Sequence, residues 1–176
     1  MKTQNYKSKK PGLSGCKNLL VFMLIAPTIS MSLIWISNFM DMKYGEFSRK
    51  AHQAKNSEAK AYIGSINKGQ QAYFAKKSTF TTSLDALEIG LKAETETSHF
   101  KYSAHTTKKA VFNYALCKDK SLKNYVGGVF VVLGKNKTNT ISILCGADSP
   151  GTIKPAEPTY QNGKLICGKG TTEVTK

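Results

Sequence analysis

Three histidines are the residues best suited to acid–base or metal chemistry, and none of them lies in a known motif. They are His52, His99 and His105. The sequence has no His-Glu-x-x-His pair, no Gly-x-Ser-x-Gly nucleophile turn and no phosphate-binding glycine loop. Asp119, Asp148 and Glu157 are isolated acids in predicted loops, where we expect solvated carboxylates. We therefore predict that the protein is not an enzyme and uses no cofactor.

The four cysteines could bind zinc or form disulfides. Zinc sites usually contain a Cys-x-x-Cys pair, which is missing here, and no histidine lies near Cys145 or Cys167. We therefore expect no metal site. Cys117, Cys145 and Cys167 all follow the apolar segment described below, whereas Cys16 precedes it. A disulfide among the last three would place that part of the chain in an oxidising compartment.

The protein is strongly basic, with 26 Lys+Arg against 11 Asp+Glu and a net charge of +15. Such a charge attracts polyanions such as DNA, acidic polysaccharide or lipid head groups. The lysines are scattered, however, and Arg49 is the single arginine, so bidentate contacts to bases or phosphates are scarce. A solvated basic surface and weak polyanion binding are the two interpretations, and neither requires a small-molecule substrate.

The predicted elements of the chain begin with an uncharged run from Leu19 to Met40, which includes Pro27. Its length is sufficient for a helix that spans the hydrocarbon core of a bilayer. Five lysines and no acid precede it, so the positive-inside rule favours a cytoplasmic N-terminus. We predict a single-pass protein in contact with membrane lipid. Its parts are a basic cytoplasmic tail (1–18), a transmembrane helix (19–40), a helical extension (41–77) and a globular head (78–176).

Apolar residues at a spacing of three to four continue the helix beyond the membrane segment. Those expected to pack against a sheet are Ala59, Tyr62, Ile63, Ile66 and Tyr73. The polar stretch 68–71 (Lys-Gly-Gln-Gln) is expected to face water.

The head has the alternating pattern of β-strands. Strands are expected over 100–105, 110–116, 129–133 and 140–145, with a polar turn over 134–139. Residues 146–176, which are rich in proline and glycine, are expected to be irregular. The predicted fold is α+β, with a long helix packed on an antiparallel sheet of about four strands.

Three segments carry a resemblance to a known family. Residues 54–73 (Ala-Lys-Asn-Ser-Glu-Ala-Lys-Ala-Tyr-Ile-Gly-Ser-Ile-Asn-Lys-Gly-Gln-Gln-Ala-Tyr) closely resemble the helix of bacterial type IV pilin-like proteins, in the branch of general secretion pathway protein H. Residues 122–131 and 143–151 resemble later segments of the same branch. The resemblance implies a pilin-like head, and it also implies a disulfide between Cys145 and Cys167, like the C-terminal loop bridge common in pilins.

The N-terminus departs from the pattern of that family. Prepilins are cleaved after a glycine that precedes an aromatic or similar residue and a Thr-Leu-Ile-Glu sequence. Here Gly12 precedes Leu13 and Gly15 precedes Cys16, and no acid occurs before Asp41. We therefore expect the apolar segment to act as a permanent anchor.

Taken with the resemblance, the sequence predicts a structural protein of a type IV pilus or a type II secretion-type apparatus, either a minor pilin or an accessory. It would act by helix packing with other pilins or assembly proteins, from the bacterial inner membrane with an extracytoplasmic head, or from the cell surface or a pilus. The alternative is a permanently anchored module whose basic head binds DNA or acidic polysaccharide.

Overall fold

The computed structural model describes residues 16–89, 95–134 and 138–174, with side chains from residue 43 onward. The chain divides into two compact units, Met1–Ser48 and Arg49–Lys176, and each is described by itself. In the part of the chain so described, no helix is both long and apolar enough to cross a membrane. The membrane span predicted over Leu19–Met40, including Pro27, lies outside the residues whose side chains are described.

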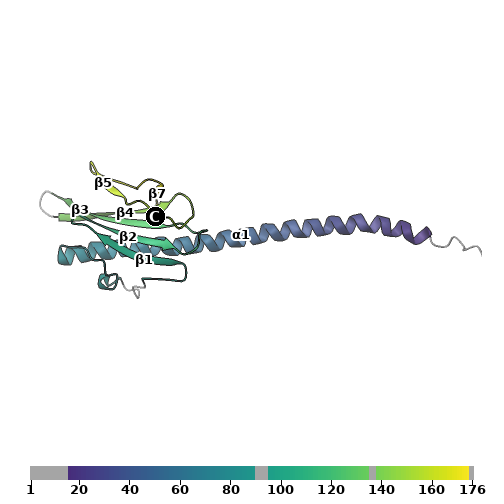
Figure 1. Cartoon of the computed structure of the whole chain (residues 1–176), viewed down its shortest axis with the longest axis horizontal. Coiled ribbons are helices and arrows are strands. Elements are labelled where there is room, and N and C mark those ends of the chain that lie inside the picture. The colour runs from purple at the N-terminus through teal and green to yellow at the C-terminus, as the bar shows by residue number, and fades with distance from the viewer. Residues whose placement is uncertain (1–15, 90–94, 135–137, 175–176) are drawn as a thin grey trace, which may run out of the picture. The chain divides into compact units, whose positions relative to one another are not determined.

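A long helix and an antiparallel sheet dominate the secondary structure (Figure 1). The helix, α1, runs over Cys16–Lys77, and a short 3-10 helix, η1, follows at Asp85–Leu87. The sheet has five strands in the order β1-β2-β3-β4-β7. Their bounds are β1 (Phe100–Thr106), β2 (Ala110–Cys117), β3 (Tyr125–Leu133), β4 (Thr138–Ala147) and β7 (Thr171–Glu173). Two further strands, β5 (Thr159–Gln161) and β6 (Lys164–Ile166), form a separate hairpin.

The C-terminal segment is more ordered than its composition predicts. Residues 148–158 contain no helix or strand, as expected, but the expectation is wrong for three short segments, because β7 adds a fifth strand to the sheet and β5 and β6 pair with each other. The β5–β6 turn is built on Asn162 and Gly163, whose φ angles of 51° and 79° are those of a tight hairpin turn. β3 begins at Tyr125 instead of Val129, and β4 begins at Thr138, inside the stretch expected to be a turn.

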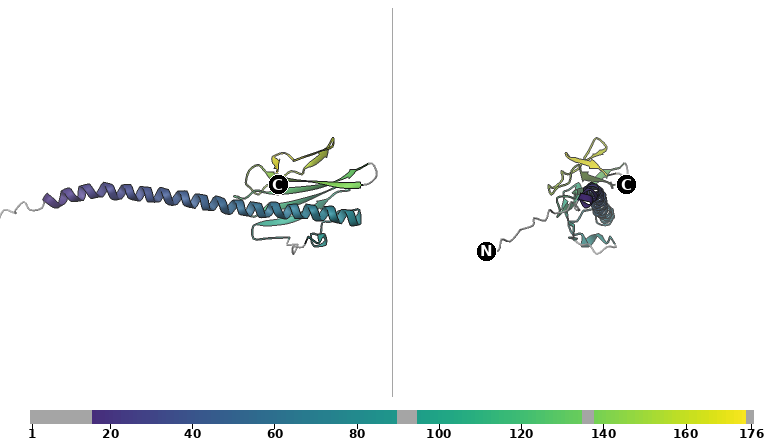
Figure 2. Two further views of the ribbon diagram at one scale, coloured as in Figure 1. Left: turned by 180° about the vertical axis from the view of Figure 1, so that it is seen from behind. Right: turned by 90° about the vertical axis from the view of Figure 1, so that its right-hand side faces the viewer.

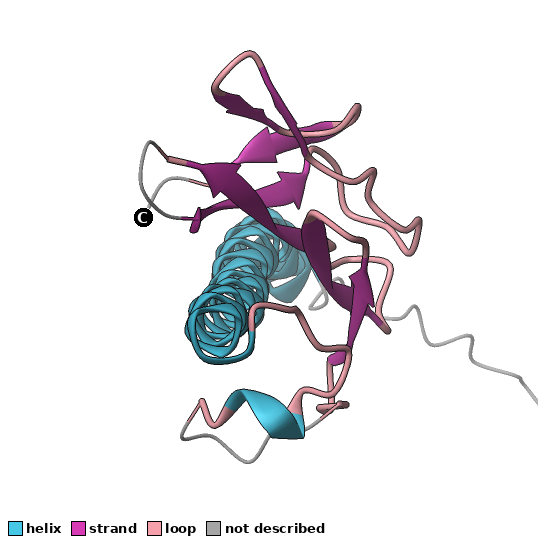
Figure 3. Cartoon of the chain, turned by 90° about the vertical axis from the view of Figure 1, so that its left-hand side faces the viewer, coloured by secondary structure: helices cyan, strands magenta, loops and turns pink. Residues whose placement is uncertain are grey.

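The sheet of the second unit is covered by α1 on one face and by the C-terminal segment over part of the other, where β1 keeps an exposed side (Figure 3). On one face the α1 residues from Arg49 onward run along the strands (Figure 2), and Ile63 and Ile66 are buried with Phe100 and Tyr102 of β1. On the opposite face the C-terminal segment lies over a second cluster. That cluster contains Phe112, Tyr114, Val126, Phe130 and Ile143, with Leu165 and Cys167 packed against it. The strands therefore form the middle layer of a three-layer head.

Candidate functional site

The α1 side chains predicted to pack have different exposures. Ala59, Ile63 and Ile66 are fully buried in the cluster between α1 and the sheet. Tyr62 and Tyr73 are partly buried against the same cluster, and the Tyr62 ring lies 4.2 Å from that of Tyr102, centroid to centroid. These positions lie on one side of α1, as their spacing requires. This part of α1 is thus fixed to the head by apolar contacts.

Two buried asparagines join α1 to the middle of the sheet. Asn67 Nδ2 donates to the carbonyl oxygen of Ile143 at 3.1 Å, and its Oδ1 accepts from Asn113 Nδ2 at 2.9 Å. The two side chains come from α1 and β2, and both residues are buried. Gly127 of β3 makes room for them, because a Cβ there would lie 2.3 Å from Asn67 Oδ1. No sequence pattern pointed to this cluster.

The stretch expected to face water along residues 68–71 is partly buried. Gly69 and Gln70 are buried, so the expectation is wrong for these two residues, while Lys68 is exposed. Gln70 Nε2 donates to the Thr81 carbonyl at 2.6 Å, and Gln70 Oε1 accepts from the Thr81 amide at 3.2 Å. The Gln70 amide thus pairs with both backbone groups of Thr81. These hydrogen bonds replace those to water, which is why Gln70 can be buried. These two hydrogen bonds attach the segment after α1 to the helix.

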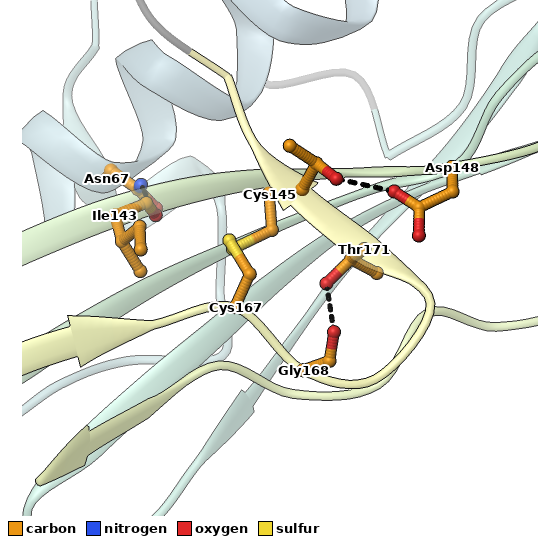
Figure 4. The surroundings of a disulfide bond; sticks show 8 residues. Asn67, Ile143, Cys145, Asp148, Cys167, Gly168 and Thr171 are labelled. Carbon is orange, nitrogen blue, oxygen red and sulfur yellow. Dashed lines mark hydrogen bonds between the residues drawn. A yellow bond between two sulfur atoms is a disulfide. The ribbon is translucent and has the colours of Figure 1, made fainter.

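A disulfide ties the C-terminal segment to the sheet (Figure 4). Cys145 of β4 is bonded to Cys167, and their Cα atoms are 5.8 Å apart, which confirms the predicted pair. Just beyond it, Thr171 Oγ1 donates to the Gly168 carbonyl at 2.6 Å, and Thr172 Oγ1 donates to Asp148 at 2.6 Å. The disulfide and the Thr172 hydrogen bond hold β7 beside the end of β4, and the Thr171 hydrogen bond closes the turn that precedes β7.

Glu157 attaches the C-terminal segment to the outer face of the sheet. Its Oε1 accepts from the Tyr114 hydroxyl and lies 3.1 Å from His105 Nδ1. Lys154 Nζ lies 4.0 Å above the Tyr114 ring, a cation–π contact. Burial, with the Glu157 carboxylate beside it, raises the pKa of Tyr114. The expectation that Glu157 is an isolated acid is therefore wrong.

The remaining acids and Cys117 have local structural partners. Asp119 accepts from the Ser121 amide at 2.9 Å, and this hydrogen bond lowers the pKa of its carboxyl.

Asn124 accepts from the Cys117 amide at 2.6 Å and donates to the carbonyls of Gly151 and Ile153. Cys117 is a free buried thiol, and its burial raises its pKa. A thiol of that kind is poorly nucleophilic.

The three histidines lie in different places. His52 of α1 is 3.3 Å from Ser121 Oγ, His105 contacts Glu157, and His99 directly precedes β1. Among the residues with described side chains, no three His, Cys, Asp or Glu gather as metal ligands would.

Two aromatic residues are exposed on α1 in the first unit. Tyr44 is 69 % exposed and Phe47 is 75 % exposed. Residues three apart lie on the same face of a helix, so the two rings form one apolar face.

The comparison with protein families identifies the chain. Neither the curated proteins nor the solved structures include a chain that matches it. The sequence model of the type IV pilin-like G and H family matches residues 56–168. This match begins on the α1 stretch that carries the amide contacts and ends just after Cys167. The chain therefore belongs to the family of type IV pilin-like G and H proteins.

Proposed function

We propose that the protein is a minor pilin or pilin-like accessory of a type IV pilus or a type II secretion-type apparatus. The observation that carries the proposal is the family match over residues 56–168, and the exposed pair Tyr44 and Phe47 on α1 adds a contact surface to it. An aromatic side chain gains about 1.5–3 kcal/mol when it moves from water into an apolar contact. Two of them on one helical face favour packing against another helix. The head stays folded through its own contacts while α1 makes the assembly.

Genetic complementation in the producing bacterium tests this proposal. Deletion of the gene should abolish or strongly reduce surface filaments or secretion of exported proteins, and the wild-type chain should restore them. A Tyr44→Glu/Phe47→Glu variant should be present in normal amounts yet fail to restore the phenotype, because charge on this face opposes helix packing. Gln53→Glu, at an exposed position of α1, is the matched control and should complement. Normal filaments and secretion after deletion would overturn the proposal.

We also propose that residues 19–40 anchor the protein permanently in the inner membrane, with the N-terminus in the cytoplasm. Support comes from the uncharged run itself, from the lysines that precede it, and from the disulfide of the head, which requires an oxidising compartment. Mass spectrometry of the purified protein should find residues 1–15 intact on a chain that resists carbonate extraction. A trimmed N-terminus would show that the anchor is processed.

DNA or acidic polysaccharide binding by the head stays a prediction. Several described lysines already contact groups of the head itself. Lys118 pairs with Glu96 at 2.5 Å, Lys76 pairs with Glu88 at 3.2 Å, and Lys123 donates to the Asp148 carbonyl at 2.8 Å. No contact among the described residues favours the polyanion alternative over the structural role.

A further inference from the structure

Among the described residues, β7 leaves most of one edge of the main sheet without a neighbouring strand. β4 pairs with β3 from Thr138 to Gly146, but β7 covers its other edge only from Cys145 to Ala147. Within the described part of the chain, the edge from Thr138 to Leu144 has no neighbouring strand. An uncovered strand edge presents backbone donors and acceptors that can pair with another extended chain.

The hydrogen-bond pattern shows which backbone groups point outward. The Leu144 carbonyl accepts from the Val174 amide at 2.9 Å, so Leu144 faces the open edge. Along an antiparallel strand, the backbone groups of every second residue point to the same edge. Those of Thr140 and Ser142 therefore point to the same edge as those of Leu144. Gln71 Nε2 already donates to the Thr140 carbonyl at 3.1 Å. The Thr140 amide and both backbone groups of Ser142 therefore face the open edge, and Ser142 is exposed.

A groove of about 880 Å³ runs between this edge and α1. The α1 side combines small residues (Ser57, Ala61, Gly64 and Ser65) with longer polar ones (Lys60, Asn67, Lys68 and Gln71). A Cβ on Gly64 would meet nothing within 4 Å, so the wall is open there. Leu144 and Val174 supply apolar surface on the other side. The groove has room for alternate side chains of a strand laid along β4.

The charges of the groove define the chemistry of its occupant. Lys60 and Lys68 line it from α1, opposed by Glu173 of β7. Five of the 26 Lys+Arg lie in residues 1–18, so the rest of the chain has 21 against 11 Asp+Glu, a net charge of +10 that opposes the approach of a second copy. An acidic segment meets no such repulsion and gains from the two lysines.

We propose that this groove binds an extended, acidic segment of a partner protein, which adds as a strand to the free edge of β4. Backbone hydrogen bonds to the Thr140 amide and to both backbone groups of Ser142 give the affinity, as in other cases of strand addition. Alternate small apolar side chains of the partner enter the groove, and its acidic residues face Lys60 and Lys68. The proposal is independent of filament assembly, because every residue of the groove belongs to the head and to the α1 residues packed on it.

Peptide binding to the full chain in detergent micelles tests the proposal. The probe is a capped peptide with a central run of alternating valine and threonine, flanked on both sides by aspartates. One control peptide replaces the aspartates with lysines, and a second carries N-methyl groups on alternate central amides. We expect fluorescence anisotropy to show at least tenfold weaker binding of both controls. Hydrogen exchange should show protection of the Thr140 and Ser142 amides by the acidic peptide alone.

Variants locate the binding on the chain. Ser142→Pro removes the outward amide and should weaken binding at least tenfold, whereas Ser142→Ala keeps that amide and should bind as the wild type does. Lys60→Glu/Lys68→Glu should weaken binding of the acidic peptide, while Lys101→Glu, on the solvent side of β1, should not. If Ser142→Pro does not fold, the N-methylated peptide tests the same hydrogen bonds.

Three results would overturn the proposal. They are equal binding of the lysine and aspartate peptides, no protection of the β4 amides by the acidic peptide, and self-association of the full chain that Ser142→Pro abolishes. The last result would make a second copy the occupant. Loss of peptide binding would leave the complementation result of the proposed function unchanged, so the two proposals fail separately.

Discussion

Asn113 on β2 donates a hydrogen bond of 2.9 Å to the side chain of Asn67 on α1, although the two residues are 46 positions apart in the sequence. Asn67 in turn donates to the Ile143 carbonyl of β4. One amide pair thus links the helix to two strands, with Gly127 of the strand between them directly beneath Asn67. A buried polar contact of this kind fixes the position of the helix along the sheet in a way that apolar contacts do not, because its partners must meet in one geometry.

Loss of this contact should destabilise the head. We expect Asn67→Ala to lower the opening free energy of the sheet, measured by hydrogen exchange on the full chain, by about 2–3 kcal/mol, because it leaves buried partners unsatisfied. Asn113→Ala should have a smaller effect, since it breaks one of the two bonds. The double variant should cost less than the sum of the two. Lys68→Ala, at the exposed neighbour, is the control, and strictly additive effects would contradict direct coupling of Asn67 and Asn113.

Gly127 and Gly64 should respond oppositely to the same substitution. A Cβ at Gly127 would lie 2.3 Å from Asn67 Oδ1 and 2.7 Å from Ile63, so Gly127→Ala must displace α1 or β3 and should cost about 1–3 kcal/mol. A Cβ at Gly64 meets nothing within 4 Å, so Gly64→Ala should stabilise the helix by about 0.5–1 kcal/mol. Thermal unfolding of the two variants separates these outcomes, and a stabilising Gly127→Ala would show that the close approach is wrong.

The Cys145–Cys167 disulfide should contribute most of the order of the C-terminal segment. It closes a loop with a sequence separation of 22, for which the chain-entropy estimate is about 3 kcal/mol. Cys145→Ser/Cys167→Ser should therefore lower stability by about that amount and make residues 148–170 sensitive to protease. Cys117→Ser is the control for loss of a thiol, and its protease pattern should match the wild type. A double variant as protease-resistant as the wild type would show that Glu157 and the buried Pro155 and Pro158 hold the segment alone.

Alkaline pH should destabilise the head through its buried tyrosines. Burial raises the pKa of Tyr102 to about 12, and burial also raises the pKa of Tyr114 and Tyr125. A raised folded-state pKa means that the unfolded chain ionises first, at its ordinary value of about 10. Stability is therefore complete below about pH 10 and falls as the pH rises toward 12.

Replacement of Tyr102 isolates its part of this effect. The free energy of unfolding of Tyr102→Phe should fall less above about pH 10 than that of the wild type. The difference between the two should reach on the order of 2 kcal/mol near pH 12. Tyr160→Phe, at an exposed ring, should leave the profile as it is in the wild type. Tyrosinate absorbance and circular dichroism, followed together against pH, measure both quantities. Ionisation of all tyrosines before any unfolding would contradict the burial of Tyr102.

The regular parts of the head could be predicted because their sequence periods are strong. Ala59, Ile63 and Ile66 repeat at helical spacing, and Phe100 and Tyr102 alternate with polar residues, so α1 and β1 follow from local pattern alone. β7 could not be found this way, because its three residues, two of them threonines, are too few to show the alternation of a strand. Its strand conformation depends on pairing with β4, where Cys145 lies opposite Glu173. The β5–β6 hairpin had a signal in Asn162-Gly163 that the surrounding prolines obscured.

The amide contacts of α1 were harder to predict than its apolar contacts. Gln70 is fully buried although glutamine usually faces water, and its partner is the backbone of Thr81. Only the fold brings that backbone beside it. The same holds for Glu157, whose partners His105 and Tyr114 lie on strands far earlier in the chain. Polar burial depends on long-range partners, and a single sequence does not show them.

Photo-crosslinking from Phe47 tests most directly whether α1 packs in a pilin assembly. A photoreactive phenylalanine at position 47, in the full chain expressed by the producing bacterium, should give crosslinks that mass spectrometry assigns to the N-terminal helices of pilin-like subunits. The same residue at position 53, on a polar exposed site of α1, should give few. Crosslinks from position 47 to lipid alone, or to no pilin-like chain, would contradict the account.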